Sequence, residues 1–174
     1  SSMETYQTTP DVDRILLLNN VSDILQSRKT KNIYFGTGHG MLVYDYKQKI
    51  LRATPNALTT PMPITTLFED QNDKILVGTD NHGLWQMTAD ENLSSFHYND
   101  PSMNIEFAKV RSFASDKDGN LIIGFAQKGV FVVPRNRNEI GYYSFSPNEN
   151  RLNATSVTSI AYDNSAFWVG TDGC

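Results

Sequence analysis

The stretch VTSIAYD at residues 157–163, followed by FWVGTDG at residues 167–173, identifies the fold because its pattern occurs three more times in the chain. Each copy has a first segment that mixes apolar and small polar residues and a second, more apolar segment that ends at a glycine. The other copies run from VSDIL to NIYFGT (21–37), from ITTLFED to KILVGT (64–79) and from VRSFASD to NLIIGF (110–125). The copies open at positions 21, 64, 110 and 157, which are 43, 46 and 47 residues apart. This spacing identifies an internal repeat.

A repeat of about 40–50 residues that is built from short strands is typical of a four-stranded β-propeller blade. The first segment of each copy is expected to line the central channel. The second is apolar enough to be covered on both faces by neighbouring blades. A third strand is expected after a glycine (Gly40, Gly83 or Gly129), and a more polar outer strand is expected near 50–54, 94–98 and 141–145. No segment has a sustained helical period, so we predict an all-β chain.

The strand count predicts about three and a half blades of a larger, seven-bladed ring. Blade 1 spans 21–60, blade 2 spans 61–106, blade 3 spans 107–153, and 154–174 supplies the first two strands of blade 4. Residues 1–20 are a lead-in, in which 4–9 stand where the outer strand of a preceding blade is expected. Because ring closure removes exposed sheet edges, the partners expected for this chain are the remaining blades of a parent ring or a second copy of the chain.

The complete pattern resembles the two-component regulator propeller repeat. It contains Val-Thr-Ser-Ile, an Asp six residues after the Val, an apolar-aromatic strand that ends in Gly-Thr, and then Gly-Leu with an aromatic residue. Residues 64–85 and 157–173 match it best. The third copy departs with Phe125 in place of the Thr, and the first has Ser27 in place of the Asp. The resemblance covers the chain from about residue 20.

This resemblance implies a sensor function. Proteins with this repeat are typically membrane-spanning hybrid histidine kinases of Bacteroidetes such as Bacteroides. Their periplasmic propellers sense carbohydrate breakdown products and control genes for polysaccharide use. The implied role is therefore a periplasmic, non-enzymatic propeller segment that recognises an oligosaccharide and signals to kinase and DNA-binding regions elsewhere in the parent protein. Two other classes stay open: a free-standing propeller enzyme resembling the streptogramin-inactivating lyases, and a protein-interaction scaffold.

Composition limits the other functions that this chain can have. The formal net charge is −4 and no Lys/Arg run exceeds two residues, so we expect no nucleic-acid partner. The single cysteine, Cys174, forms no intrachain disulfide and supports no multi-cysteine metal site. No phosphate-cradling or nucleophile-elbow motif is present, so we predict no cofactor, no metal and no catalytic residue.

The candidate ligand-binding residues lie in hairpins, on the outer strands and near the connections. His39 and His82 precede the glycine of the third strand in adjacent copies, so they should share one face of the ring. Either histidine is more simply explained as a polar turn residue, because two histidines without a partner carboxylate are a weak zinc signal. The other candidates are two aromatic residues suited to stacking on sugars, Tyr98 and Tyr142, and two cations, Arg111 and Arg151.

Two sets of residues recur in register and are interpreted as structural. The glycines end the second strands at positions 36, 78, 124 and 170 (Gly36, Gly78, Gly124 and Gly170). The carboxylates end the first strands (Asp70, Asp116 and Asp163). An Asp at the end of a strand can accept hydrogen bonds from the following turn, and a feature present in several blades is more consistent with a structural role than with a single active site.

Overall fold

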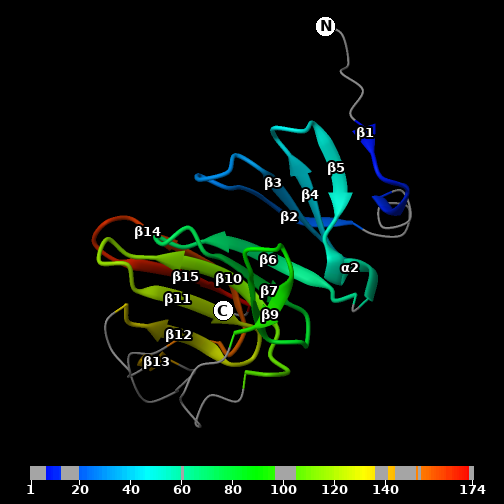
Figure 1. The fold of residues 1–174 in the computed structure, drawn as a ribbon. Coiled ribbons are helices and arrows are strands. Elements are labelled where there is room, and N and C mark those ends of the chain that lie inside the picture. Colours follow the sequence, from blue (N-terminus) through cyan, green and yellow to red (C-terminus); the bar gives the residue numbers. More distant parts are fainter. Residues whose placement is uncertain are drawn as a thin grey trace, which may run out of the picture.

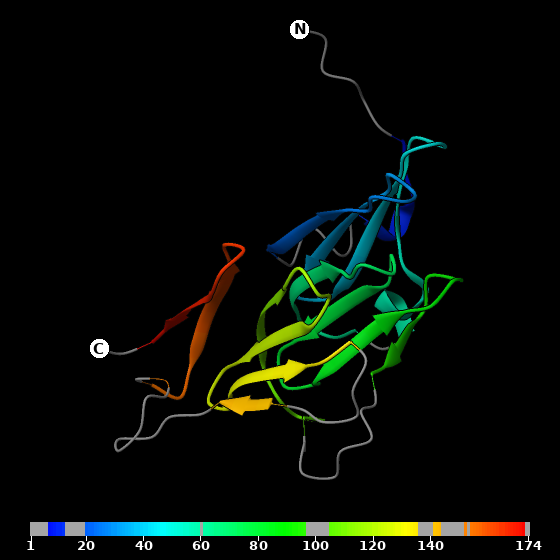
Figure 2. The same ribbon diagram turned by 90° about the vertical axis from the view of Figure 1, so that its left-hand side faces the viewer.

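The computed structural model describes residues 7–12, 20–59, 61–96, 105–135, 141–143, 152 and 154–172. The strands form four sheets that follow one another in chain order, and all strand pairs but one are antiparallel (Figures 1 and 2). No helix in these ranges is long and apolar enough to cross a membrane.

The first sheet contains β2 (Val21–Gln26), β3 (Ile33–Thr37), β4 (Gly40–Asp45) and β5 (Ile50–Ala53). The second contains β6 (Ile64–Glu69), β7 (Ile75–Thr79), β8 (Leu84–Met87) and β9 (Leu93–Ser95). The third contains β10 (Val110–Ser115), β11 (Leu121–Phe125), β12 (Gly129–Val133) and β13 (Gly141–Tyr143). The fourth consists of β14 (Val157–Tyr162) and β15 (Phe167–Thr171).

The first strands of the sheets lie against one another, β2 against β6, β6 against β10, and β10 against β14. They therefore form the inner layer of the arrangement, while the later strands of each sheet extend outward (Figure 2). Consecutive strands within a sheet are hydrogen-bonded neighbours, as a meander of short hairpins requires. The prediction of an all-β chain built from propeller blades is confirmed.

Strand alternation explains how a thin sheet contributes to two cores. In β7, Ile75 and Val77 pack toward the first sheet, whereas Leu76 between them packs toward the third. In β11, Ile123 belongs to the core shared with the second sheet, and Ile122 to the core shared with β14 and β15. Successive side chains of a strand point to opposite faces, so a continuous apolar run fills both inter-sheet layers.

The glycines of the second strands make room for the next sheet. A Cβ added to Gly78 would lie 2.6 Å from Cγ2 of Thr66 and 2.8 Å from Cγ1 of Val110, the first residue of β10. The same construction at Gly124 gives 2.6 Å to Cγ1 of Val157. These distances are shorter than any carbon–carbon contact, so the approach of each inner strand to the preceding sheet requires glycine.

The N-terminal segment takes a different place from the one expected. β1 (Gln7–Thr8) pairs in parallel with β5 and becomes the fifth strand of the first sheet, rather than the outer strand of a preceding blade. The physical reason is that Val12, which is fully buried, anchors this segment in a core with Leu42 and Ala57. Ala57 lies on α2 (Pro55–Thr59), a short helix in a connection that carried no helical signal.

A charged tie joins the first two sheets at the end opposite their β3–β4 and β7–β8 hairpins. The buried Glu69 carboxylate accepts hydrogen bonds from the Ser27 hydroxyl at 2.8 Å and from the Arg28 backbone N–H at 2.8 Å. The Arg28 guanidinium adds a third contact at 2.9 Å. Burial by itself would raise the pKa of Glu69, but these donors outweigh it and hold the pKa below the ordinary value for glutamate.

Replacing Gly78 by Ala should lower the free energy of unfolding by about 1–3 kcal/mol, because the new methyl group overlaps Thr66 and Val110. Gly170→Ala is the matched control, since its methyl group would meet only the Ser159 and Thr158 hydroxyls within 3.2 Å, and those side chains can rotate. Urea denaturation of both variants measures the difference. Equal losses in the two variants would contradict the steric explanation.

Glu69→Gln should destabilise the chain by about 1–2 kcal/mol at pH 7, because an amide cannot replace the ionised acceptor of three donors. A lowered folded-state pKa adds stability above the ordinary value of 4.5, and this stability is lost as the pH falls through the folded-state pKa. The gap between wild type and variant should therefore close below about pH 4.5. Urea titrations at several pH values test this expectation, and a gap that does not change with pH would contradict it.

Candidate functional site

The hairpins between the second and third strands share one end of the sheets with the connections that lead into each first strand. Backbone hydrogen bonds join these two kinds of segment in the same way in three sheets. The N–H of Asp80 donates to Pro63 at 2.9 Å, that of Ala126 to Lys109 at 2.9 Å, and that of Asp172 to Ser156 at 3.0 Å. The hairpin glycines extend this network to the next connection, because Gly83 N–H donates to Ala108 and Gly129 N–H to Thr155.

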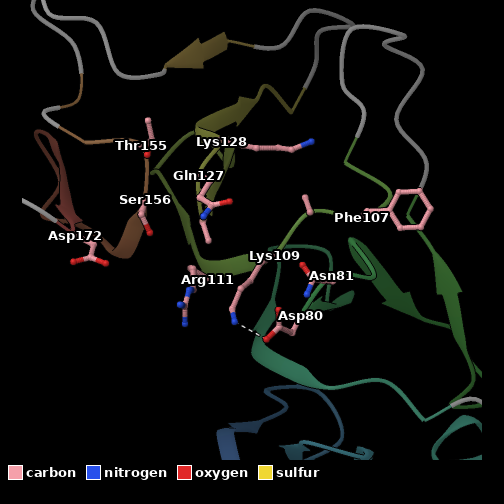
Figure 3. A pocket seen from close by; sticks show the side chains of 12 residues that line it. Asp80, Asn81, Phe107, Lys109, Arg111, Gln127, Lys128, Thr155, Ser156 and Asp172 are labelled. Carbon is pink, nitrogen blue, oxygen red and sulfur yellow. Dashed lines mark hydrogen bonds and ion pairs between the residues drawn. The ribbon is translucent and has the colours of Figure 1, made fainter.

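This end of the molecule contains a half-open polar cleft of about 730 Å³ (Figure 3). Its lining comes from the β7–β8 hairpin, the connection before β10, β10 itself, the β11–β12 hairpin, the connection before β14, and the end of β15. The lining residues are Asp80, Asn81, Phe107, Ala108, Lys109, Arg111, Ala126, Gln127, Lys128, Thr155, Ser156 and Asp172. A ligand here would therefore contact three successive sheets.

The charges in the polar cleft are partly neutralised within it. The Lys109 ammonium lies 2.5 Å from the Asp80 carboxylate, and both side chains are about 30% exposed. Arg111 is exposed and extends into the open part of the cleft (Figure 3). Within the described part of the chain, its guanidinium has no hydrogen-bond or ion-pair partner. Arg111 therefore offers a cation to a ligand in this cleft.

Arg111 occupies the bulge that recurs in every inner strand. The register between first and second strands shifts at the second residue of β2, β6, β10 and β14. In the first sheet this residue is Ser22, whose hydroxyl donates to Ile64 O of the next sheet at 2.6 Å. In the second sheet it is Thr65, which donates to Val110 O at 2.5 Å. The third sheet has arginine where the first two have a hydroxyl that ties neighbouring sheets together.

The other predicted site residues lie outside the polar cleft or outside the residues that the structure describes. His39 and His82 lie exposed in the β3–β4 and β7–β8 hairpins, at the same end of the sheets as the cleft, but neither lines it. Nδ1 of His82 lies 2.9 Å from the carbonyl oxygen of Asp80. Tyr142 is paired with Phe131 across β12 and β13, and its side chain is not described. Tyr98 and Arg151 lie outside the described residues.

Most of the lining was missed by the sequence analysis, although the repeat carried a signal for it. Asp80 and Asp172 both follow a second strand directly, and Lys109 and Ser156 directly precede a first strand. In three sheets the residue after the second strand donates its N–H to the residue before the first strand, and the hairpin glycines Gly83 and Gly129 donate to the next connection, so these positions gather at one end of the sheets. Aligning the repeats and inspecting the residues that flank the strands would have selected them.

The recurring aspartates lie at the other end of the sheets and close the turn after each first strand. Oδ1 of Asp70 accepts the N–H groups of Asn72 and Lys74, each at 2.8 Å. Asp116 and Asp163 accept turn N–H groups in the same manner. In the first sheet Ser27 takes this place, and its hydroxyl oxygen accepts the N–H groups of two turn residues.

Comparison with known proteins identifies the fold of the chain. No protein-family model matches it, and no curated protein matches it in sequence. Similar solved structures include the extracellular domain of a proposed regulatory system from Bacteroides thetaiotaomicron, described in one structure as a one-component system and in another as a hybrid two-component system. These two align with TM-scores of 0.70 and 0.67, with 19% and 20% identity, over 87% of this chain and 20% of the other.

Two further structures broaden this comparison. The extracellular domain of a second proposed hybrid two-component system from B. thetaiotaomicron has a TM-score of 0.65 and 19% identity over 85% of this chain and 18% of the other. Virginiamycin B lyase from Staphylococcus aureus, an inactive variant with quinupristin, has a TM-score of 0.62 and 11% identity over 88% of this chain and 49% of the other. The chain thus spans about a fifth of the extracellular domains and about half of the lyase, and shares the fold of both.

Proposed function

We propose that this chain is part of a ligand-recognising propeller in the periplasmic sensor region of a hybrid two-component system. Its fold is like that of the extracellular domains of two such systems, and its repeat resembles the one typical of those sensors. The observation that carries the proposal is the polar cleft around Arg111, which three successive sheets form with their loops.

The chemistry of the polar cleft suits a carbohydrate breakdown product. Its rim offers hydroxyl and amide groups from Thr155, Ser156 and Gln127, which match the donors and acceptors of a sugar ring. Phe107 is 70% exposed at the edge of the cleft, and a solvent-facing aromatic ring can cover the apolar face of a sugar. Backbone hydrogen bonds hold the hairpins and connections in place, so the site is largely formed before a ligand arrives.

A ligand that spans three sheets can transmit its presence through their packing. The polar cleft touches the β7–β8 hairpin, the β11–β12 hairpin and the end of β15, so a bound saccharide would favour one relative arrangement of these sheets. In a parent sensor, that preference would pass to the membrane-proximal part and then to a kinase and to transcription. Recognition alone is required of this segment, with no chemistry on the ligand.

A thermal-shift screen of neutral and acidic oligosaccharides should find ligands that raise the melting temperature. A ligand that binds only the folded state stabilises it by about 2.7 kcal/mol at a hundred times its dissociation constant. Phe107→Ala should weaken the shift while leaving the unliganded melting temperature unchanged, because the ring is mostly exposed. Tyr46→Ala, which removes an exposed aromatic residue outside the cleft, should leave the shift intact.

The same screen separates this proposal from the two other classes. If no saccharide of either kind stabilises the chain, the sensor proposal is wrong and a protein-interaction scaffold is favoured. If a compound is converted rather than retained, and conversion is lost in His39→Ala and His82→Ala variants, an enzyme related in fold to the lyase is favoured.

A further inference from the structure

One side chain of the polar cleft departs from the blade repeat. The bulge residue of the inner strand carries a hydroxyl in the first, second and fourth sheets (Ser22, Thr65 and Thr158), but is Arg111 in the third. The hydroxyls of Ser22 and Thr65 bond to the first residue of the next sheet. No such bond joins Arg111 to Val157 in the described structure. The third sheet thus lacks an inter-sheet tie at the position where it places a cation.

The surroundings of Arg111 leave its charge available. Lys109 is already neutralised by Asp80. Asp172 is drawn apart from the guanidinium in Figure 3, and no ion pair joins the two within the described residues. The whole chain carries a net charge of −4, so a general positive field would not draw an anion here. Attraction of an anion to the cleft must therefore come from a local cation.

We propose that Arg111 binds the anionic group of the ligand, and that the ligand is an acidic saccharide bearing a carboxylate. This inference rests on the proposed function and specifies the class of its ligand. A guanidinium presents a planar pair of N–H donors that matches a carboxylate in a bidentate contact. The hydroxyls of Thr155 and Ser156 and the amide of Gln127 line the same cleft and can meet the sugar hydroxyls.

The test compares digalacturonate with its neutral counterpart galactobiose by isothermal titration calorimetry on the 174-residue chain. Wild type should bind digalacturonate at least about tenfold more tightly, because a hydrogen bond to a charged group adds that much discrimination. The affinity should fall as salt is raised.

The decisive variant is Arg111→Thr, which gives the third sheet the bulge residue of the second. It should lose about tenfold or more in digalacturonate affinity. Its melting temperature should stay equal to that of wild type or rise, because the new threonine hydroxyl can donate a hydrogen bond to the carbonyl oxygen of Val157. Lys74→Thr removes one positive charge at the opposite end of the second sheet and should leave binding unchanged.

The outcomes separate this inference from the proposed function. Equal binding of the two disaccharides, or an unchanged affinity in Arg111→Thr, would overturn the inference while leaving saccharide sensing intact. Tighter binding of glucose 6-sulfate than of digalacturonate, with the same dependence on Arg111, would replace the carboxylate by a sulfate ester. Failure of every acidic and neutral saccharide to bind would overturn both proposals.

Discussion

The packing of neighbouring sheets depends on glycines, which have no side chain. Where one sheet meets the next, the first residue of an inner strand rests against the glycine of the preceding second strand, with Ile64 on Gly36, Val110 on Gly78 and Val157 on Gly124. Ile64, Val110 and Val157 are at most 2% exposed. Because the same residue begins the inner strand, this contact decides where the next sheet starts. Connections can therefore vary in length, whereas the distance from glycine to neighbouring strand cannot.

The polar cleft follows from that contact. Fixing the start of an inner strand also fixes the connection before it, which then lies within hydrogen-bonding distance of the hairpin after the second strand, as Ala126 and Lys109 show. Loops from three sheets meet at one end as a result. The opposite end carries the turns closed by Asp70, Asp116 and Asp163, together with the tie between Glu69 and Arg28. Side chains at the opposite end thus stabilise the fold, whereas the cleft end is held by backbone hydrogen bonds and its side chains can vary.

Much of this fold could be predicted because the repeat reports strand order directly. The strands after Gly40 and Gly129 begin at those residues, and the predicted propeller blades are confirmed. Features that occur once had no such signal. Pairing of β1 with β5 depends on the burial of Val12, and the acceptor role of Glu69 depends on Ser27 and Arg28, which are about 40 positions away in the chain. Arg111 was identified as a polar residue near a strand start, but its partners in the cleft come from loops whose meeting only the backbone hydrogen bonds reveal.

The recurring bulge has a consequence for how propeller blades can diversify. A bulged residue is the extra one in its strand, so it has no fixed partner across the ladder and its replacement disturbs no pairing. Ser22, Thr65, Arg111 and Thr158 hold this place, one in each sheet. A single codon change there exchanges a hydroxyl for a charge without altering the length of any loop. Each blade therefore carries one position on its inner strand where a charge can replace a hydroxyl, and in the first two sheets the change would give up one hydrogen bond to the next sheet while strand pairing stays the same.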